Sequence, residues 1–418
     1  MVKRRAPVDG VEHETGAARR KRIHVRLRTA GHSDAMEGAV LTIERIETIP
    51  IRVPLPFTYS GSYYRMRNRC TIITRVHTAE GIVGEAYNAD EDSPIQEEVL
   101  RIVNDELAPR VKGLDCMGTE RCWEAMLPVT FDQLRPRWYA MQAIACVDTA
   151  IWDAVGKAVG QPLWRLWGGY RDRMPMIGIG GYYIPDSPEA KGQEIEREID
   201  FFKSECGMVG MKFKIGGKAP AEDAARLARA RRHAGDDFLF VVDANQGYTV
   251  PEALAFLAAA RAVGIEVRWF EEPTRWHADF RGLRDVRMRG NIPVAAGQSE
   301  WSRVGMREMM VNGAIDVSNY DASWGGGPSE WRRVAALAAS FDVQLGHHEE
   351  AQVGAHLLAS VPHGTYVEAF SPTRDPIFWN MIENRPDLVC GEFPLSETPG
   401  LGWVLDKAFI EKYRTDRA

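Results

Sequence analysis

The chain has 418 residues, of which 45% are hydrophobic and 26% charged, so it is long enough for two domains or for one barrel with an added lid. The formal net charge of −6 gives no indication of a nucleic-acid partner, and no apolar run approaches the roughly 18 residues that a membrane-spanning helix needs. The cysteines are scattered without a CxxC pair, which favours a reducing, cytoplasmic location over a disulfide-stapled fold.

Positive charge is concentrated at the start of the chain. Residues 1–35 carry nine Lys or Arg against four Asp or Glu, and the densest run, Arg19 to Arg22, is not followed by the apolar stretch of a secretory signal. We expect residues 1–40 to form a disordered basic extension; alternatively, residues 1–35 lie upstream of a natural start at Met36. A basic arm that contacts nucleic acid or membrane is the alternative.

Two β-rich segments follow, LTIERIETIPIRVPL from Leu41 and CTIITRVHTAEGIVGEA from Cys70, and a predicted hairpin turn at 79–81 interrupts the second. Between these segments, residues 57–68 are rich in Tyr, Ser, Gly and Arg and predict a mobile loop. Helical periodicity then marks roughly 93–111, 117–128 and 138–159. Strands followed by helices predict an α+β unit over residues 41–165.

From residue 170 onward, short apolar strands alternate with amphipathic helices. The expected strands are 174–184, 209–216, 238–245, 267–273, 292–300, 314–323, 343–348 and 365–370. Ala-rich helical segments separate them. Eight such units in about 200 residues predict a closed parallel barrel over residues 170–384. An open doubly wound sheet is less favoured, because no GxGxxG turn follows the first strand.

Polar and charged residues stand near the C-terminal ends of these strands, where a buried parallel strand should be apolar. Seven successive strands carry them: Lys212 and Lys214, Asp243 and Asn245, Glu271 and Glu272, Gln298 and Glu300, Asp321, His347 and His348, and Glu368. Each alone has an ordinary structural explanation, such as a helix cap for a strand-end Asp. Their coincidence on seven strands instead indicates an active site at the barrel mouth.

The chemistry open to these groups is narrow. Acidic and amide oxygens that converge from adjacent strands suit a hard cation such as Mg²⁺. A lysine beside such a metal can have a lowered pKa and act as a neutral amine base. His348 near Asp321 would be an oriented imidazole, a second base or acid. A base on each side of a metal-bound carboxylate suits abstraction of an α-proton.

Six motifs occur in order on the expected barrel strands: KFK, VDANQGY, FEEPT, YDASWGGG, HH and VEAF. Together with DTAIWDAVGKAVGQPLWRLWGG before the barrel, they resemble the mandelate racemase subgroup of the enolase superfamily over roughly residues 41–415. The resemblance implies a (β/α)7β TIM-like barrel. It also implies that residues 41–165 form an α+β capping domain, which residues 385–418 complete. Sites of this superfamily use a Lys or His base with Mg²⁺.

The resemblance further implies roles for the residues around the substrate. Lys214 would be one base, and His348, paired with Asp321, would be the base or acid on the opposite face. Lys212 would help to hold the substrate carboxylate. Glu368 would hydrogen-bond that carboxylate as an electrophilic stabiliser.

By the same resemblance, Asp243, Glu271 and Gln298 would hold one Mg²⁺ per subunit, and Asn245 would contact the substrate. The third ligand in the family is usually Glu, so Gln298 departs from the pattern. An amide oxygen can coordinate Mg²⁺, but the site loses one negative charge, and we expect weaker metal binding. Two alternatives stay open: Glu300 on the same strand face reaches the ion, or the metal has two protein ligands and waters.

The favoured reaction is dehydration of an acid sugar to a 2-keto-3-deoxy acid, because family members with both the Lys and the His–Asp pair resemble that type. The alternatives are a racemase or epimerase of a 2-hydroxy acid, a cycloisomerase of a sugar lactone, and a catalytically silent barrel with a basic nucleic-acid-binding arm. The lid segments 57–68 and 88–92 would supply specificity. Tyr182 and Tyr183 either add a hydroxyl to the site or pack in the barrel. We expect a cytoplasmic homo-oligomer, from dimer to octamer, that takes a small sugar acid.

Overall fold

The computed structural model describes residues 40–88, 95–184, 190–277, 279–388 and 390–417. The expectations for the basic extension therefore lie outside the described residues, and so does most of the lid segment 88–92. Within the described part of the chain, no helix combines the length and the apolar character that crossing a bilayer requires.

An antiparallel sheet of three strands forms the cap: β1 (Ile43–Ser60), β2 (Arg65–Thr78) and β3 (Val83–Asn88). The predicted turn at 79–81 is confirmed, but the predicted loop at 57–68 is wrong. The strands continue to Ser60 and resume at Arg65, and Gly61 N–H donates to Tyr64 O at 3.1 Å across the tip. Aromatic and Thr residues favour a pleated strand, which explains why these positions join the hairpin.

Helices cover one face of this sheet: α1 (Ile95–Arg101), η1 (Ile102–Leu107), α2 (Ala108–Val111), α3 (Thr119–Met126), η2 (Leu127–Phe131), α4 (Arg137–Val159) and α5 (Leu163–Leu166). The long helix α4 is buried along most of its length, because it packs against the cap sheet on one side and α11 (Gly327–Ala339) of the barrel on the other. Gly84 permits the contact with β3, since a Cβ there would stand 2.0 Å from the carbonyl oxygen of Ala150.

Eight parallel strands follow in the predicted order: β4 (Arg173–Gly180), β5 (Gly210–Lys214), β6 (Leu239–Asp243), β7 (Phe270–Glu271), β8 (Val294–Ala296), β9 (Val317–Ser318), β10 (Gln344–Leu345) and β11 (Val367–Phe370). From β4 to β10 each strand pairs with the next one in sequence, and β11 pairs with β4. Leu345 closes the ring, since its N–H donates to His363 O and its carbonyl accepts from Thr365 N–H, both at 2.8 Å. The predicted (β/α)7β barrel with a cap is confirmed.

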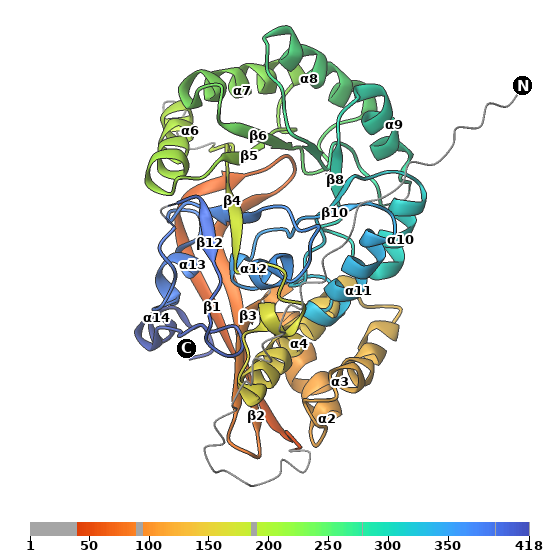
Figure 1. Ribbon diagram of the computed structural model, residues 1–418, viewed down its shortest axis with the longest axis vertical. Coiled ribbons are helices and arrows are strands. Elements are labelled where there is room, and N and C mark those ends of the chain that lie inside the picture. The colour runs from red at the N-terminus through yellow and green to blue at the C-terminus, as the bar shows by residue number, and fades with distance from the viewer. Residues whose placement is uncertain (1–39, 89–94, 185–189, 278, 389, 418) are drawn as a thin grey trace, which may run out of the picture. The chain divides into compact units, whose positions relative to one another are not determined.

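Seven helical connections surround the ring (Figure 1). They are α6 (Ala190–Asp200) with η3 (Phe201–Glu205), α7 (Pro220–Ala234), α8 (Val250–Ala262), α9 (Arg281–Gly290), α10 (Arg303–Val311), α11 (Gly327–Ala339) and α12 (Ala351–Ala359). After α13 (Pro376–Met381), β12 (Glu392–Pro394) pairs with β4 and α14 (Lys407–Tyr413) packs on β1. The chain from Val40 onward forms one compact unit, and the domain boundaries given above stay predictions.

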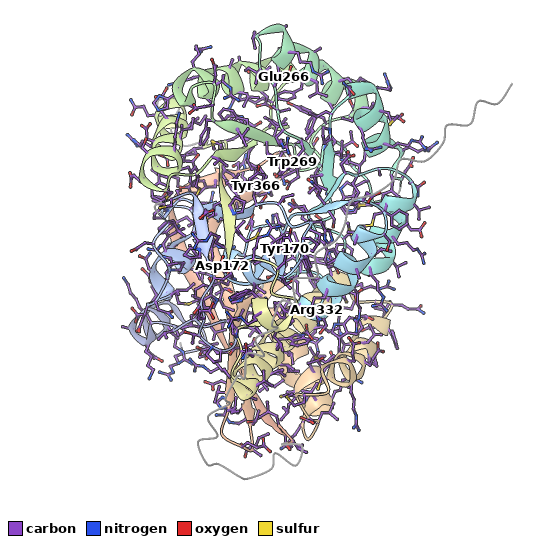
Figure 2. All side chains as sticks on the ribbon, in the orientation of Figure 1. Tyr170, Asp172, Glu266, Trp269, Arg332 and Tyr366 are labelled. Carbon is purple, nitrogen blue, oxygen red and sulfur yellow. The ribbon has the colours of Figure 1, made fainter. Side chains whose placement is uncertain are left out.

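The barrel interior changes character along the strands. Near the strand starts it is filled by an apolar cluster that includes Val241, Trp269, Val317 and Tyr366. The rings of Trp269 and Tyr366 lie beside each other, with centroids 6.0 Å apart (Figure 2). Two residues further along the same strands come Asp243, Glu271, Asn319 and Glu368. Because side chains alternate along a strand, both sets share the inner face, and the second set points into the carboxyl end.

Candidate active site

Buried ion pairs join the ends of four barrel strands. Lys212 Nζ lies 2.8 Å from Glu271 Oε1 and 2.6 Å from Glu368 Oε1, and Lys214 Nζ lies 2.7 Å from Asp243 Oδ2. Strand pairing sets these contacts, because Lys214 stands opposite Asp243, and Asp243 opposite Glu271. All five side chains are almost wholly removed from solvent. The structure therefore brings this part of the predicted site together.

The carboxylates decide the charge of both lysines. Burial alone would lower the pKa of each ammonium, but Glu271 and Glu368 outweigh burial at Lys212 and raise its pKa. Asp243 likewise raises the pKa of Lys214 well above its usual value. The lowered lysine pKa expected from the sequence is therefore not produced by the protein groups alone, since each lysine has a carboxylate within hydrogen-bond distance.

Oxygen atoms from three adjacent strands make a donor set that fits a divalent cation. Asp243 ends β6, Glu271 ends β7, and Gln298 follows β8, where its Oε1 is buried and has no hydrogen-bond partner among the described residues. A buried acceptor without a donor is uncommon and suggests a missing ligand. No group of three or more His, Cys, Asp or Glu side chains in the described chain could hold a metal ion, so an amide oxygen would have to complete the set.

The other proposed ligand, Glu300, turns away from this donor set. Its Oε1 accepts from Trp301 N–H at 3.0 Å, and its carboxyl group packs against Gly305, where a Cβ would stand 2.0 Å from the Glu300 Cδ. Burial raises the pKa of this carboxyl group. These contacts point Glu300 toward the start of α10.

Two neighbouring histidines have different surroundings. His348 Nδ1 lies 2.9 Å from Asp321 Oδ2, and its Nε2 lies 3.2 Å from Glu349 Oε1. These carboxylates outweigh burial and raise the pKa of His348 well above its usual value. His347 Nε2 instead accepts from Ala322 N–H at 3.1 Å, which makes His347 a structural residue.

The hairpin of the cap reaches the barrel mouth at Asn245. Tyr64 donates from its hydroxyl to Asn245 Oδ1 at 3.2 Å, and the Ser62 hydroxyl donates to Asn245 O at 2.9 Å. Asn245 N–H donates to Asp243 Oδ1 at 2.8 Å. Asn245 has a φ of 40°, a left-handed conformation that Asn tolerates better than most residues. Asn245 thus connects the cap to one of the predicted metal ligands.

A cavity of about 350 Å³ lies between the hairpin and the barrel mouth. Its lining residues are Tyr64, Arg65, Met66, Asn68, Asn245, Gln246, Glu272, Gln298, Ser299, Trp324, His348 and Glu349. Of the predicted site residues, His348, Asn245 and Gln298 line it. The two lysines, the carboxylates of the ion pairs and Asp321 do not line this cavity.

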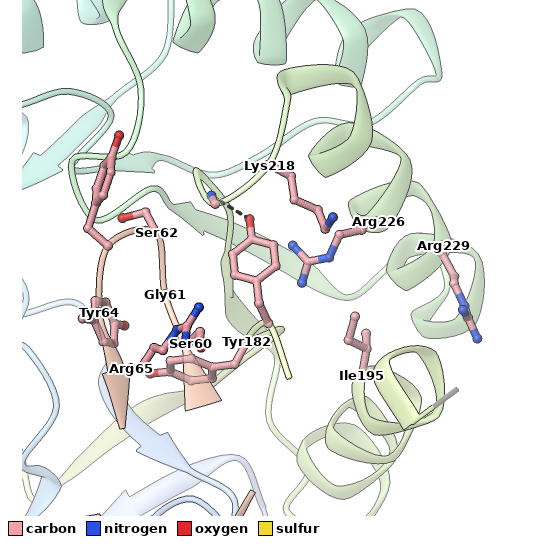
Figure 3. Close-up of a pocket in the computed structure, with 13 residues that line it drawn as sticks. Ser60, Gly61, Ser62, Tyr64, Arg65, Tyr182, Ile195, Lys218, Arg226 and Arg229 are labelled. Carbon is pink, nitrogen blue, oxygen red and sulfur yellow. Dashed lines mark hydrogen bonds between the residues drawn. The ribbon is translucent and has the colours of Figure 1, made fainter. Parts of the chain in front are cut away.

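A larger cavity of about 630 Å³ lies on the other side of the hairpin, with Lys218, Arg226 and Arg229 along its far wall (Figure 3). Tyr64 and Arg65 line both cavities, so the hairpin tip separates them. None of the predicted acid, base or metal residues lines this second cavity.

Two tyrosines that follow β4, Tyr182 and Tyr183, both line the larger cavity but differ in their hydrogen bonds. Tyr183 donates to Asp223 Oδ1 at 2.6 Å and accepts from Gly217 N–H at 3.0 Å, so it is structural. The Tyr182 hydroxyl is buried without a hydrogen-bond partner among the described residues, and the Tyr182 ring centroid lies 5.5 Å from Lys214 Nζ. Of the two tyrosines, Tyr182 is therefore the one whose hydroxyl is available to the active site.

Two residues of the site were not predicted from the sequence. Asn319 donates to Glu271 Oε1 at 2.9 Å, and its signal was available, because it lies two residues after the interior Val317. Glu349 contacts His348 from a tight turn after β10, and no periodicity marks such a position.

Comparison with known proteins finds relatives of both the cap and the barrel. Residues 45–168 match the N-terminal domain of mandelate racemase / muconate lactonizing enzyme, and residues 194–409 match the enolase C-terminal domain-like family. A 3,6-anhydro-alpha-L-galactonate cycloisomerase from Streptomyces coelicolor is 31% identical over 329 residues, which cover 78% of this chain and 88% of that protein. An arabinonate dehydratase from Saccharolobus solfataricus is 29% identical over 353 residues, or 82% and 90% of the two chains.

A solved structure is also similar to this chain in sequence and in fold. The mandelate racemase/muconate lactonizing enzyme from a marine actinobacterium, solved in complex with magnesium, is 52% identical, with a TM-score of 0.82, and the match covers 90% of this chain and 100% of that chain. The two family matches together span the cap sheet and nearly the whole barrel. On these matches and this fold, the chain belongs to the mandelate racemase/muconate lactonizing enzyme family of the enolase superfamily.

Proposed function

We propose that this protein is a divalent-cation-dependent enzyme that removes the α-proton of a sugar acid and then expels the β-oxygen, giving a 2-keto-3-deoxy acid. One observation carries the proposal: Lys214 and His348 stand at strand ends on different sides of one mouth. In the ring, β4 and β11 separate them in one direction and β6 to β9 in the other. Two acid–base groups that flank a substrate can work on its opposite faces.

Each side chain has a task in this mechanism. Lys214 takes the α-proton as a neutral amine, which requires that Asp243, whose carboxylate raises the pKa of Lys214, be engaged by the cation instead. The buried Lys212 ammonium pairs with the substrate carboxylate. Glu368 carries a proton in this complex and donates a hydrogen bond to the same carboxylate. The imidazole of His348, oriented through Nδ1 by Asp321, delivers a proton from Nε2 to the departing oxygen. The enol that results tautomerises to the keto acid.

Asp243, Glu271 and Gln298 would hold the cation, and Asn245 would contact the substrate. The buried, unpartnered Gln298 Oε1 and the magnesium in the marine actinobacterial relative support this assignment. When bound, a divalent cation supplies Lewis-acid stabilisation of the charge that develops on the substrate carboxylate. We propose Mg²⁺, one ion per subunit, because the donor set is all oxygen.

Cycloisomerisation is the second candidate, favoured by the 31% identical relative named for that reaction. The first step is the same, but the departing oxygen belongs to a ring of the substrate and stays attached to the product. A racemase or epimerase would use the same two groups to return the proton, and that alternative is separated by the experiment below.

The test is a screen of mono- and diacid sugars, their lactones and anhydro acids with Mg²⁺, with NMR detection of products in D₂O. Dehydratase activity gives a keto acid with loss of water, whereas cycloisomerase activity gives a keto acid with the composition of the substrate. Deuterium at the α-carbon without any keto acid would shift the assignment to racemase or epimerase. No product and no exchange with any acid would refute the proposal.

We further propose a cytoplasmic homo-oligomer whose partner is its small-molecule substrate. Light scattering after size exclusion gives the assembly state directly, and a monomer at micromolar concentration would contradict the expected range from dimer to octamer.

A further inference from the structure

Glu349 lines the active-site cavity but has no part in the mechanism above. Glu349 is 6% exposed, and its Oε1 lies 3.2 Å from His348 Nε2. Its Oε2 has no hydrogen-bond partner among the described residues. Arg69 Nη1 forms an ion pair with Oε2 at 3.8 Å, which is beyond hydrogen-bond distance.

The backbone holds this carboxylate in place through an unusual turn. Glu349 and Glu350 both adopt left-handed conformations, with φ values of 47° and 43°, which residues with a Cβ rarely do. Two contacts keep the turn: Glu349 N–H donates to Glu368 Oε2 at 3.0 Å, and Glu350 Oε1 pairs with Arg69 Nη2 of β2 at 2.7 Å. Strain that surrounding contacts maintain is typical of functional positions.

Cations keep Glu349 ionised. Burial alone would raise its pKa, but His348, Arg374 and Arg69 outweigh burial and hold the pKa well below the usual value. Arg374 is fully buried among the rings of Tyr182 and Phe370 and forms no ion pair among the described residues. An ionised carboxylate only accepts hydrogen bonds, so Oε2 requires a donor.

The His348 imidazole and the Glu349 carboxylate at this wall of the cavity determine which substrate groups can bind beside them. His348 Nε2 carries a proton when the imidazole is charged, and it donates to an acceptor, whereas Glu349 Oε2 accepts from a donor. Two neighbouring oxygens of a sugar acid supply the acceptor and the donor, since one oxygen accepts from the imidazole and the next hydroxyl donates to the carboxylate. An alkyl or aryl group would leave the buried carboxylate oxygen unpaired, which is costly.

We propose that Glu349 is a specificity-determining residue whose Oε2 accepts a hydrogen bond from the substrate's 4-hydroxyl, next to the 3-oxygen that His348 protonates. This inference rests on the proposed function, and it narrows the substrate to acids with oxygens on both carbons. Dehydration and cycloisomerisation are both compatible with it, because each expels the 3-oxygen.

The test compares two probes on the Mg²⁺-loaded enzyme: the aldonic acid that the wild type converts fastest, and its 4-deoxy analogue, which still carries the α-proton and the 3-hydroxyl. Hydrogen bonds to charged groups are worth about 10- to 100-fold in such comparisons. We expect the wild type to prefer the parent acid by about that factor in kcat/KM. Glu349→Leu should lose the preference, mainly through a higher KM for the parent acid, and Glu349→Gln should keep part of it.

Glu330→Gln is the matched control, because it removes a buried carboxylate that pairs with Arg303 and does not line the cavity. It should keep the wild-type preference even if the protein melts earlier. If Glu349→Leu does not fold, as judged by circular dichroism, the preference for the parent acid is measured with Glu349→Gln. An unchanged preference in both Glu349 variants would overturn the inference while leaving the proposed function intact. A wild type that neither converts nor exchanges any acid would refute both.

Discussion

Two buried polar regions of this protein look alike in composition and differ in how well their atoms are paired. Where α4 of the cap meets α11 of the barrel, Ser329 donates to Asp148 from its N–H at 2.9 Å and from its hydroxyl at 2.7 Å. Trp152 Nε1 donates to Ser329 Oγ at 2.9 Å. At the barrel mouth, by contrast, Gln298 Oε1 and Glu349 Oε2 have no hydrogen-bond partner among the described residues.

Folding alone explains the first region but not the second. Buried polar atoms are paired in nearly all proteins, because an unpaired one costs about 1–3 kcal/mol. The group formed by Asp148, Ser329 and Trp152 is complete without a ligand, whereas unpaired atoms around a cavity indicate that a ligand completes them. Substitutions at the mouth should therefore change turnover, and substitutions at the α4–α11 contact should change stability.

The largest effect is expected from Lys214→Ala. Loss of a general base lowers turnover by about 10²- to 10⁴-fold, so kcat should fall at least that far on the substrate found in the screen. Lys218→Ala is the control, because Lys218 is a partly exposed residue of the outer cavity and should leave kcat unchanged. Full turnover in both Lys214→Ala and His348→Ala would show that the site is wrongly placed.

Asp148→Ala tests the other region. The substitution leaves the Ser329 N–H and hydroxyl without their acceptor, and we expect the free energy of unfolding to fall by about 1–3 kcal/mol. Turnover per folded molecule should not change, because Asp148 lies outside both cavities at the mouth. Urea denaturation and kcat on the same preparation measure the two quantities. A loss of kcat at unchanged stability would contradict the distinction between the regions.

The same aspartate gives a pH dependence of stability. Burial raises the pKa of Asp148 to about 7 in the folded protein, from 3.8. A raised pKa favours the protonated folded state, so this contribution is complete below about pH 4 and is lost as pH rises through 7. Each pKa unit corresponds to about 1.4 kcal/mol, so about 2 kcal/mol should disappear between pH 5 and pH 7. Denaturation curves of wild type and Asp148→Asn should therefore converge in this window as pH rises; parallel profiles would show that Asp148 is ionised throughout.

The smallest effect is expected on the affinity for Mg²⁺, and it tests which residues hold the metal ion. Gln298→Glu adds one negative charge to the donor set, and we expect Mg²⁺ to bind about 10-fold more tightly, because charge count tunes the affinity of such sites. Glu300→Gln should leave the affinity unchanged, since the Glu300 carboxylate faces the Trp301 N–H. Isothermal titration with Mg²⁺ measures both variants. Weaker binding in Glu300→Gln, with no change in Gln298→Glu, would make Glu300 the ligand.

Much of the fold follows from local pattern. Alternating and apolar runs predicted all eight barrel strands in order, although the paired segments are shorter than predicted; the sixth, expected over 314–323, is Val317–Ser318. Residues such as Asp321 lie beyond the last ladder hydrogen bond, in the loops that build the site. The hairpin at 57–68 was predicted as a loop, because its composition resembles a loop and its pairing partner lies on the next strand.

Local sequence was enough to predict which strands carry ionisable groups and on which face, because side chains alternate along a strand with a period of two residues. How those groups pair with one another depends on the folded barrel. It raised the pKa of Lys214 through Asp243, turned Glu300 away from the mouth, and set Glu349 against His348. Distances across a barrel mouth and the charge they impose depend on how distant strands close into a ring, and no spacing along the chain encodes them.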